Sequence, residues 1–169
     1  MKTIPFGLEE RLGKLLREHG KTISVAESCT GGLISHRITN IPGSSDYYEG
    51  GVVSYSNKSK TDILHVSPIT LKKLGAVSYQ TAKEMAKGIR QIYGTDLGIA
   101  TTGIAGPGGG SPKKPVGLVY ICLSIQDKTI CRRFTFKGSR REIKTKSSEA
   151  ALRIVIRYLL SVLKEDRKD

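Results

Sequence analysis

The chain has 169 residues and carries 28 Lys or Arg against 15 Asp or Glu, which gives a formal net charge of +13. This length suits one domain with a sizeable core, so residues 1–169 are expected to form a single domain. The apolar stretches fall far short of the roughly 20 residues that span a bilayer, and no signal-peptide pattern opens the chain, so we expect a cytoplasmic protein without membrane contacts.

The positive charge favours anionic partners, such as phosphorylated small molecules or nucleic acid. However, the Lys and Arg residues are dispersed, and the chain has no Trp and only three Phe. No combination of basic and aromatic residues typical of nucleic-acid recognition occurs. A nucleic-acid partner is therefore compatible with the charge, but no sequence motif supports it. A solvated cationic surface is the simpler explanation of the charge.

The cysteines and histidines indicate neither a disulfide framework nor a metal site. Cys29, Cys122 and Cys131 are an odd number of cysteines without a short Cys-x-x-Cys spacing. The three histidines are scattered and have no ligand spacing. We therefore expect no disulfide, no metal and no cofactor.

Hydrophobic periodicity predicts helices and strands along the whole chain. The predicted helices cover residues 6–19, 33–39, 57–64, 68–74, 78–93 and 139–163. The predicted strands cover residues 22–26, 50–56, 97–101, 116–125 and 129–136, the last two forming an antiparallel hairpin. This order indicates an α/β fold with a sheet of about five strands.

The turn Ala26–Gly32 joins the first predicted strand to the second predicted helix. A hydroxyl at such a junction can attack a carbonyl group, and nearby backbone N–H groups can stabilise the resulting oxyanion. The alternative is that Ser28 or Thr30 only caps the helix.

Two further segments follow strands and have an unusual composition. They are Tyr55–Lys60 and the Gly-rich loop Thr102–Gly110. If the first three strands are parallel, both segments lie beside Ser28 at the edge where open α/β sheets bind ligands. Alone, each is weak: a Tyr and a Lys at this spacing are usually packed and solvated respectively, and the loop is not a Walker phosphate loop.

Several sequence blocks, in order, resemble the CinA carboxy-terminal-domain family, whose characterised members are nicotinamide-nucleotide amidases. The similarity runs from about residue 8 to residue 163. The blocks are AESCTGG at 26–32, PGSS at 42–45, GGVVSYSN at 50–57, GAVS at 75–78, TGIAGPGG at 102–109 and KPVG at 114–117.

The resemblance implies a three-layer α/β/α fold around a mixed five-stranded sheet. It also implies hydrolysis of the carboxamide of nicotinamide mononucleotide to nicotinate mononucleotide and ammonia, in pyridine nucleotide salvage. Larger family members carry an additional amino-terminal domain, and this chain is similar to the stand-alone amidase form.

The family's proposed catalytic serine, tyrosine and lysine fall on Ser28, Tyr55 and Lys60. A lysine can act as a base only when deprotonated, and both burial and nearby positive charge lower its pKa. Tyr55 could relay a proton or help protonate ammonia. The expected substrate-binding residues are Glu27, Thr30, Gly31, Gly32, Ser44, Asn57, Thr102, Gly103, Gly106, Gly108 and Gly109.

Within that set, backbone N–H groups near Thr30, Gly31 and Gly32 are candidates for the oxyanion hole, and the glycines of the 103–110 loop for close approach to the ribose phosphate. With Ser28 as the nucleophile, Thr30 becomes the better candidate for the cap. Cys29 is the rival nucleophile, because a helix N-terminus can lower a thiol pKa.

Two residues depart from the family pattern. Lys58 stands where an acidic residue is usual, and Lys113 where a glutamate is common. The added charge could aid phosphate binding, enlarge a basic surface or disturb the network around Lys60.

Two alternatives to this amidase stay open. One is a non-enzymatic binding protein associated with competence or DNA damage, which uses the pocket or the basic surface. The other is amidase chemistry on a different carboxamide. A homodimer is also compatible with the long apolar-faced C-terminal helix and an edge strand.

Overall fold

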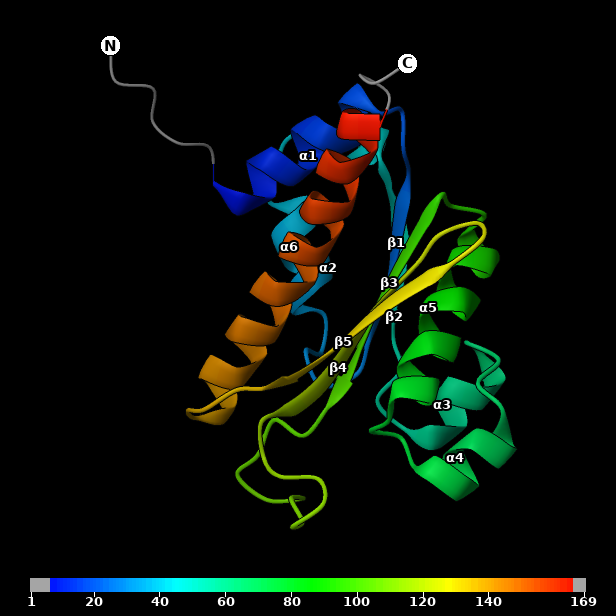
Figure 1. Ribbon diagram of the computed structural model, residues 1–169, viewed down its shortest axis with the longest axis vertical. Coiled ribbons are helices and arrows are strands. Elements are labelled where there is room, and N and C mark those ends of the chain that lie inside the picture. Colours follow the sequence, from blue (N-terminus) through cyan, green and yellow to red (C-terminus); the bar gives the residue numbers. More distant parts are fainter. Residues whose placement is uncertain (1–6, 166–169) are drawn as a thin grey trace.

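A five-stranded mixed sheet organises the protein, whose computed structural model describes residues 7–165 (Figure 1). The strand order is β2-β1-β3-β4-β5. The strands are β1 (Ile23–Glu27), β2 (Tyr48–Val53), β3 (Leu97–Gly103), β4 (Leu118–Ser124) and β5 (Thr129–Thr135).

The pairing of the strands confirms the predicted α/β class. β1 pairs in parallel with both β2 and β3, so the carboxyl ends of these three strands meet at one edge. β3 pairs antiparallel with β4, and β4 with β5 in the predicted hairpin. β2 begins two residues before the predicted strand, directly after a short 3₁₀ helix at Ser44–Asp46, and it ends at Val53.

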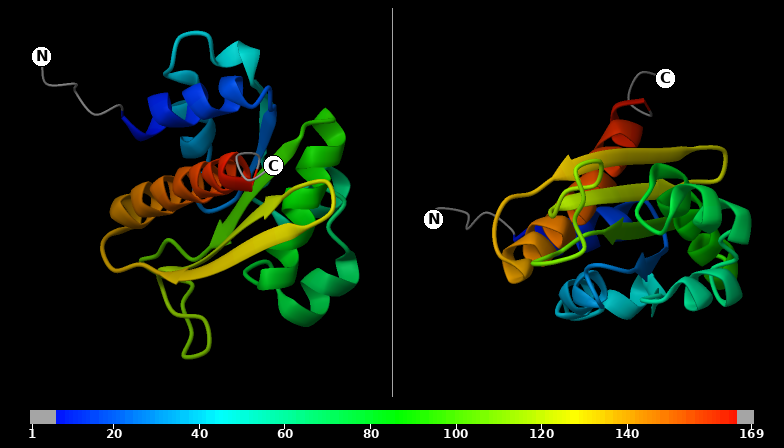
Figure 2. Two further views of the ribbon diagram at one scale, coloured as in Figure 1. Left: turned by 45° about the horizontal axis from the view of Figure 1, so that its top comes forward. Right: turned by 90° about the horizontal axis from the view of Figure 1, so that it is seen from below.

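Helices cover both faces of the sheet and make three layers (Figures 1 and 2). One layer holds α1 (Leu8–Glu18), α2 (Leu33–Thr39) and α6 (Arg140–Glu165). The other holds α3 (Asn57–Asp62), α4 (Pro68–Leu74) and α5 (Tyr79–Tyr93). In the part of the chain that is described, none of these helices has the length and apolar character needed to cross a membrane.

The two central strands are buried on both faces, which explains their continuous apolar sequence. Successive side chains of a strand point to opposite faces. Val25 and Ile99 accordingly belong to the core beneath α1, α2 and α6. Ala26 and Ala100 belong to the smaller core beneath α5.

Two glycines allow α5 to pack closely against its neighbours. A Cβ atom on Gly88 would collide with the backbone carbonyl oxygen of Leu64. A Cβ atom on Gly98 of β3 would collide with the carbonyl oxygen of Ala86. Neither obstacle is a flexible side chain, so this approach depends on both glycines.

The expectation of no disulfide is wrong, because Cys122 and Cys131 are bonded to each other. The two cysteines face each other directly in the β4–β5 ladder, with their Cα atoms 4.1 Å apart. The prediction relied on the absence of a short Cys-x-x-Cys spacing. Two cysteines that face each other across paired strands can form a disulfide without such a spacing. Cys29 remains a free, buried thiol.

We predict that Gly88→Ala destabilises the protein by about 1–3 kcal/mol, although alanine is the better helix former. The added methyl group must displace backbone at Leu64, which cannot rotate away. Urea unfolding followed by circular dichroism measures the change. Lys87→Ala, at an exposed position of the same helix, is the control and should stay within about 0.5 kcal/mol of wild type. Equal stability of both variants would contradict the close packing.

Candidate active site

The carboxyl ends of the three parallel strands form a pocket of about 250 Å³ that brings Ser28, Tyr55 and Lys60 together. The loop between β3 and β4 forms its other wall. The remaining lining residues are Cys29, Ala76, Val77, Thr102, Gly103, Ile104, Ala105, Gly106, Gly108 and Arg140.

Lys60 is the central residue of this pocket. Ser56 caps α3 by accepting a hydrogen bond from the Ser59 N–H group, and the single turn that follows directs Lys60 inward. The Lys60 side chain is 1% exposed, and its Nζ lies 3.1 Å from Ser28 Oγ and 2.7 Å from the Ser54 carbonyl oxygen. Burial lowers the pKa of Lys60 from its ordinary value, because desolvation penalises the ammonium form.

Glu27 holds the turn that carries Ser28. Its fully buried carboxylate accepts hydrogen bonds from the N–H groups of Gly32, Ile34 and Ser35, at 2.9–3.0 Å, and one from Ser35 Oγ at 2.8 Å. These donors come from the first turn of α2 and its preceding residue. Glu27 therefore stabilises the turn that carries Ser28, but it does not line the pocket itself.

The prediction that Thr30 caps α2 is wrong. The cap position is Gly32, without a side-chain hydrogen bond, and Glu27 satisfies the helix N–H groups instead. The Thr30 hydroxyl is buried and lies 2.8 Å from Thr101 Oγ1. Of the predicted oxyanion donors, the Gly31 N–H donates to the Ser28 carbonyl oxygen and the Gly32 N–H to Glu27, so neither is free for an oxyanion.

Cys29 lies beside Ser28 but is not set up as a nucleophile. Burial, reinforced by the Glu27 carboxylate, raises the pKa of its thiol to about 12. A thiol with that pKa is protonated at neutral pH, and the thiolate is the reactive form. The geometry therefore favours Ser28, which has Lys60 within hydrogen-bonding distance.

Tyr55 enters the pocket from its open side, with 63% of the residue exposed. Its hydroxyl accepts a hydrogen bond of 2.7 Å from Arg140 Nη2, and Arg140 Nη1 donates to the Gly106 carbonyl oxygen at 2.8 Å. Arg140 thus joins Tyr55 to the Gly-rich loop. The sequence reasoning missed Arg140, although the Ser139 and Glu142 spacing, which forms reciprocal capping bonds, marks the start of α6.

The other predicted binding residues separate into three groups. Thr102, Gly103, Gly106 and Gly108 line the pocket that contains Ser28 and Lys60. Thr30, Gly31 and Gly32 line a neighbouring groove. Three more lie outside both cavities: Ser44, which precedes the amino end of β2 at the opposite edge of the sheet, Asn57 and Gly109.

The two departures from the family pattern leave the Lys60 contacts intact. Lys58 is exposed and pairs with Asp62 on the outer side of α3. Lys113 lies at an exposed position of the β3–β4 loop and lines neither cavity.

The polar groups of the pocket are hydroxyls, an amine, a guanidinium, backbone amides and the Cys29 thiol, which its raised pKa keeps protonated. These groups suit an organic substrate better than a metal ion, which prefers carboxylate, imidazole or thiolate ligands. Among the side chains that the structure describes, no group of three or more His, Cys, Asp or Glu residues is placed to hold a metal ion.

Known sequences resemble this chain over most of its length. The family model of the CinA C-terminal domain matches residues 6–159. A competence-damage inducible protein, as its name describes it, of Moorella thermoacetica is 53% identical over 152 residues, which are 90% of this chain and 37% of that protein. A CinA-like protein of Syntrophus aciditrophicus is 51% identical over 153 residues, 90% of this chain and 36% of that protein. The chain therefore spans less than two fifths of these curated relatives.

Solved structures show the same architecture over nearly the whole chain. The competence/damage inducible protein CihA from Agrobacterium tumefaciens has a TM-score of 0.85 at 39% identity, covering 92% of this chain and 98% of that one. A CinA superfamily protein from Klebsiella pneumoniae has a TM-score of 0.88 at 30% identity, covering 91% of this chain and 96% of that one.

The buried amine gives the stability of the protein a defined pH dependence. Because the folded-state pKa of Lys60 lies below the ordinary 10.5, the folded protein binds fewer protons than the unfolded chain between the two pKa values. The free energy of unfolding of wild type should therefore rise with pH in that window relative to Lys60→Met. The slope cannot exceed about 1.4 kcal/mol per pH unit.

Denaturant unfolding at several alkaline pH values measures this difference. Lys87→Met, at an exposed position of α5, controls for the loss of one positive charge. If the free energies of unfolding of wild type and Lys60→Met change with pH in the same way across this window, burial does not shift the pKa of the Lys60 amine.

Proposed function

The chain belongs to the CinA C-terminal domain family, and we propose that it is an amidohydrolase acting on nicotinamide mononucleotide. It would convert the carboxamide of this nucleotide to the carboxylate of nicotinate mononucleotide and release ammonia. The observation that carries the proposal is the 3.1 Å contact between Ser28 Oγ and the buried Lys60 Nζ.

A serine and a buried lysine are a sufficient pair for nucleophilic attack on an amide. The serine hydroxyl needs a base within hydrogen-bonding distance, and a lysine serves when its amine is neutral. Two features of Lys60 favour this role: it contacts Ser28, and burial lowers its pKa toward the range in which the amine is neutral. Its second partner, the Ser54 carbonyl oxygen, fixes the direction of the amine.

In the first half of the reaction, Lys60 Nζ accepts the proton of Ser28 Oγ as the oxygen attacks the carboxamide carbon. The carbonyl π electrons move onto the oxygen and form a tetrahedral oxyanion. Collapse of this intermediate breaks the C–N bond, and the proton held by Lys60 passes, with Tyr55 as the relay, to the leaving nitrogen, which departs as ammonia and leaves Lys60 neutral again. An ester between Ser28 and the pyridine carboxyl group remains.

In the second half, Lys60 accepts a proton from water as the water oxygen attacks the ester. Collapse of the second tetrahedral intermediate expels Ser28 Oγ, which takes that proton back from Lys60, and nicotinate mononucleotide is released. Tyr55 supports proton delivery in the first half. Arg140 Nη2 donates to the Tyr55 oxygen, which leaves the Tyr55 proton free to point at a leaving nitrogen. Because Tyr55 is on the open side, substrate can enter past it.

A binding role in competence or DNA damage is the alternative that the names of the relatives suggest. Such a role would not need a desolvated amine next to a serine hydroxyl. Burying an amine without a charged partner costs stability, and perturbed groups of this kind cluster at catalytic sites. The amidase explains that arrangement, so it is the function we propose.

We predict that Ser28→Ala lowers turnover of nicotinamide mononucleotide by several orders of magnitude, because it removes the attacking oxygen. Ammonia and nicotinate mononucleotide, measured together and without added metal, should appear in equal amounts with wild type. Cys29→Ala is the matched comparison at the neighbouring residue and should keep most of the turnover. An active Ser28→Ala, or loss of turnover only in Cys29→Ala, would refute the assignment.

A further inference from the structure

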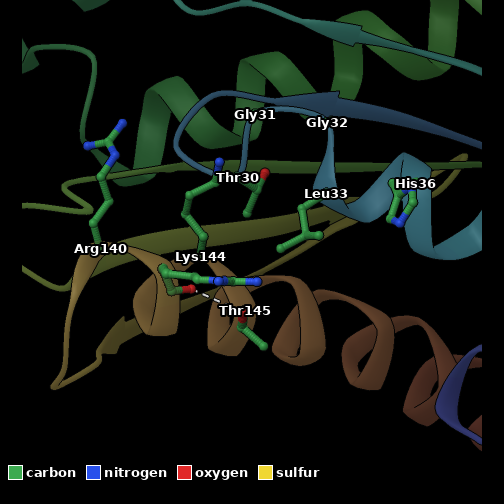
Figure 3. A pocket seen from close by; sticks show the side chains of 9 residues that line it. Thr30, Gly31, Gly32, Leu33, His36, Arg140, Lys144 and Thr145 are labelled. Carbon is green, nitrogen blue, oxygen red and sulfur yellow. Dashed lines mark hydrogen bonds between the residues drawn. The ribbon is translucent and has the colours of Figure 1, made fainter.

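A second cavity adjoins the catalytic pocket and is not used by the mechanism. It is a groove of about 700 Å³ between the start of α2 and the first two turns of α6 (Figure 3). Its lining residues are Thr30, Gly31, Gly32, Leu33, His36, Arg140, Arg141, Lys144 and Thr145. Arg140 and the Ser28 turn lie at the junction of the two cavities.

The groove contains cations without counter-ions. Arg141 and Lys144 have neither an ion pair nor a side-chain hydrogen bond to any residue in the described part of the chain. The Arg140 guanidinium has two neutral partners, Tyr55 and the Gly106 carbonyl oxygen. The groove lining contains no Asp or Glu.

Lys144 is the cation that the fold directs most specifically into the groove. It extends from α6 toward Gly31 and Thr30 on the opposite wall (Figure 3). A Cβ atom on Gly31 would lie 3.3 Å from Lys144 Nζ, so the ammonium sits against the backbone of the turn that carries Ser28. Lys144 is half-buried there, although most of the other Lys and Arg side chains that the structure describes are exposed.

From this arrangement we propose that the groove binds the phosphate of the nucleotide whose carboxamide lies at Ser28, with Arg141 and Lys144 as its ligands. A phosphate supplies the negative charge that the groove lacks, and Arg and Lys form charge-assisted hydrogen bonds to it. The catalytic pocket of about 250 Å³ then holds the pyridine and its ribose. This proposal rests on the proposed function, and it assigns the phosphate to α6 and not to the Gly-rich loop that the sequence suggested.

The test compares two substrates that differ only in the phosphate, nicotinamide mononucleotide and nicotinamide riboside. Lys144→Met and Arg141→Met should each lower the ratio of their kcat/KM values about tenfold, since each removes a charged ligand of the phosphate. Lys87→Met, which removes a cation from the other side of the sheet, should keep the wild-type ratio. A ratio that is the same in all four proteins would overturn the proposal while leaving the amidase intact.

A binding measurement separates this proposal from the function on which it rests. Ribose 5-phosphate has the phosphate and sugar but no amide, so calorimetric titration with it requires no catalysis. Its affinity should fall about tenfold in Lys144→Met and in Arg141→Met, and decrease as salt increases. If wild type binds it and these variants bind it equally well, or if wild type does not bind it, the groove is not the phosphate site, whatever the amidase assay shows.

Discussion

The burial of one lysine amine is the constraint on which the rest of this site depends. Lys60 has two hydrogen-bond partners, a hydroxyl and a backbone carbonyl oxygen, and neither carries a charge. Such surroundings lower the pKa of the amine, because desolvation penalises the ammonium form. In the function we propose, this lowered pKa is what lets Lys60 act as a base, and the Ser28 hydroxyl is the group within its reach.

The strands and turns around Lys60 fix the positions of its two hydrogen-bond partners. The parallel pairing of β1 with β2 brings the Ser28 turn next to Ser54, whose N–H donates to the Glu27 carbonyl oxygen. The Glu27 carboxylate accepts hydrogen bonds from N–H groups of the turn and of α2. These bonds hold the turn that carries Ser28 in place. The Ser28–Lys60 pair thus rests on a turn that is held by several backbone hydrogen bonds, as a preorganised site requires.

Periodicity and turn residues predicted most of the architecture, because strands buried on two faces and amphipathic helices have strong sequence signals. The five strands, the antiparallel hairpin of the last two and the helices follow from that pattern and are present. The parallel pairing of the first three strands was only assumed, and the structure shows it. The resemblance then selected Ser28, Tyr55 and Lys60, which line one pocket. Periodicity alone could not have selected Lys60, since Lys58 two residues earlier on the same short helix is exposed.

What could not be predicted depends on contacts between distant segments. Arg140 is 85 residues from Tyr55 in the sequence, and only the packing of α6 beside the Gly-rich loop brings them together. Glu27 was assigned to the substrate because it stands in the motif, but its oxygens are used within the turn. The Cys122–Cys131 bond likewise depends on the register of a hairpin, which residue spacing does not reveal.

The most direct test of this account is an NMR titration of the Lys60 side chain, compared with the pH profile of kcat/KM for nicotinamide mononucleotide. The account predicts that Lys60 titrates below the ordinary 10.5 and that activity rises with the same midpoint as the amine becomes neutral. A Lys60 amine that titrates at or above 10.5, with activity already at its plateau while the amine is charged, would contradict its role as the base.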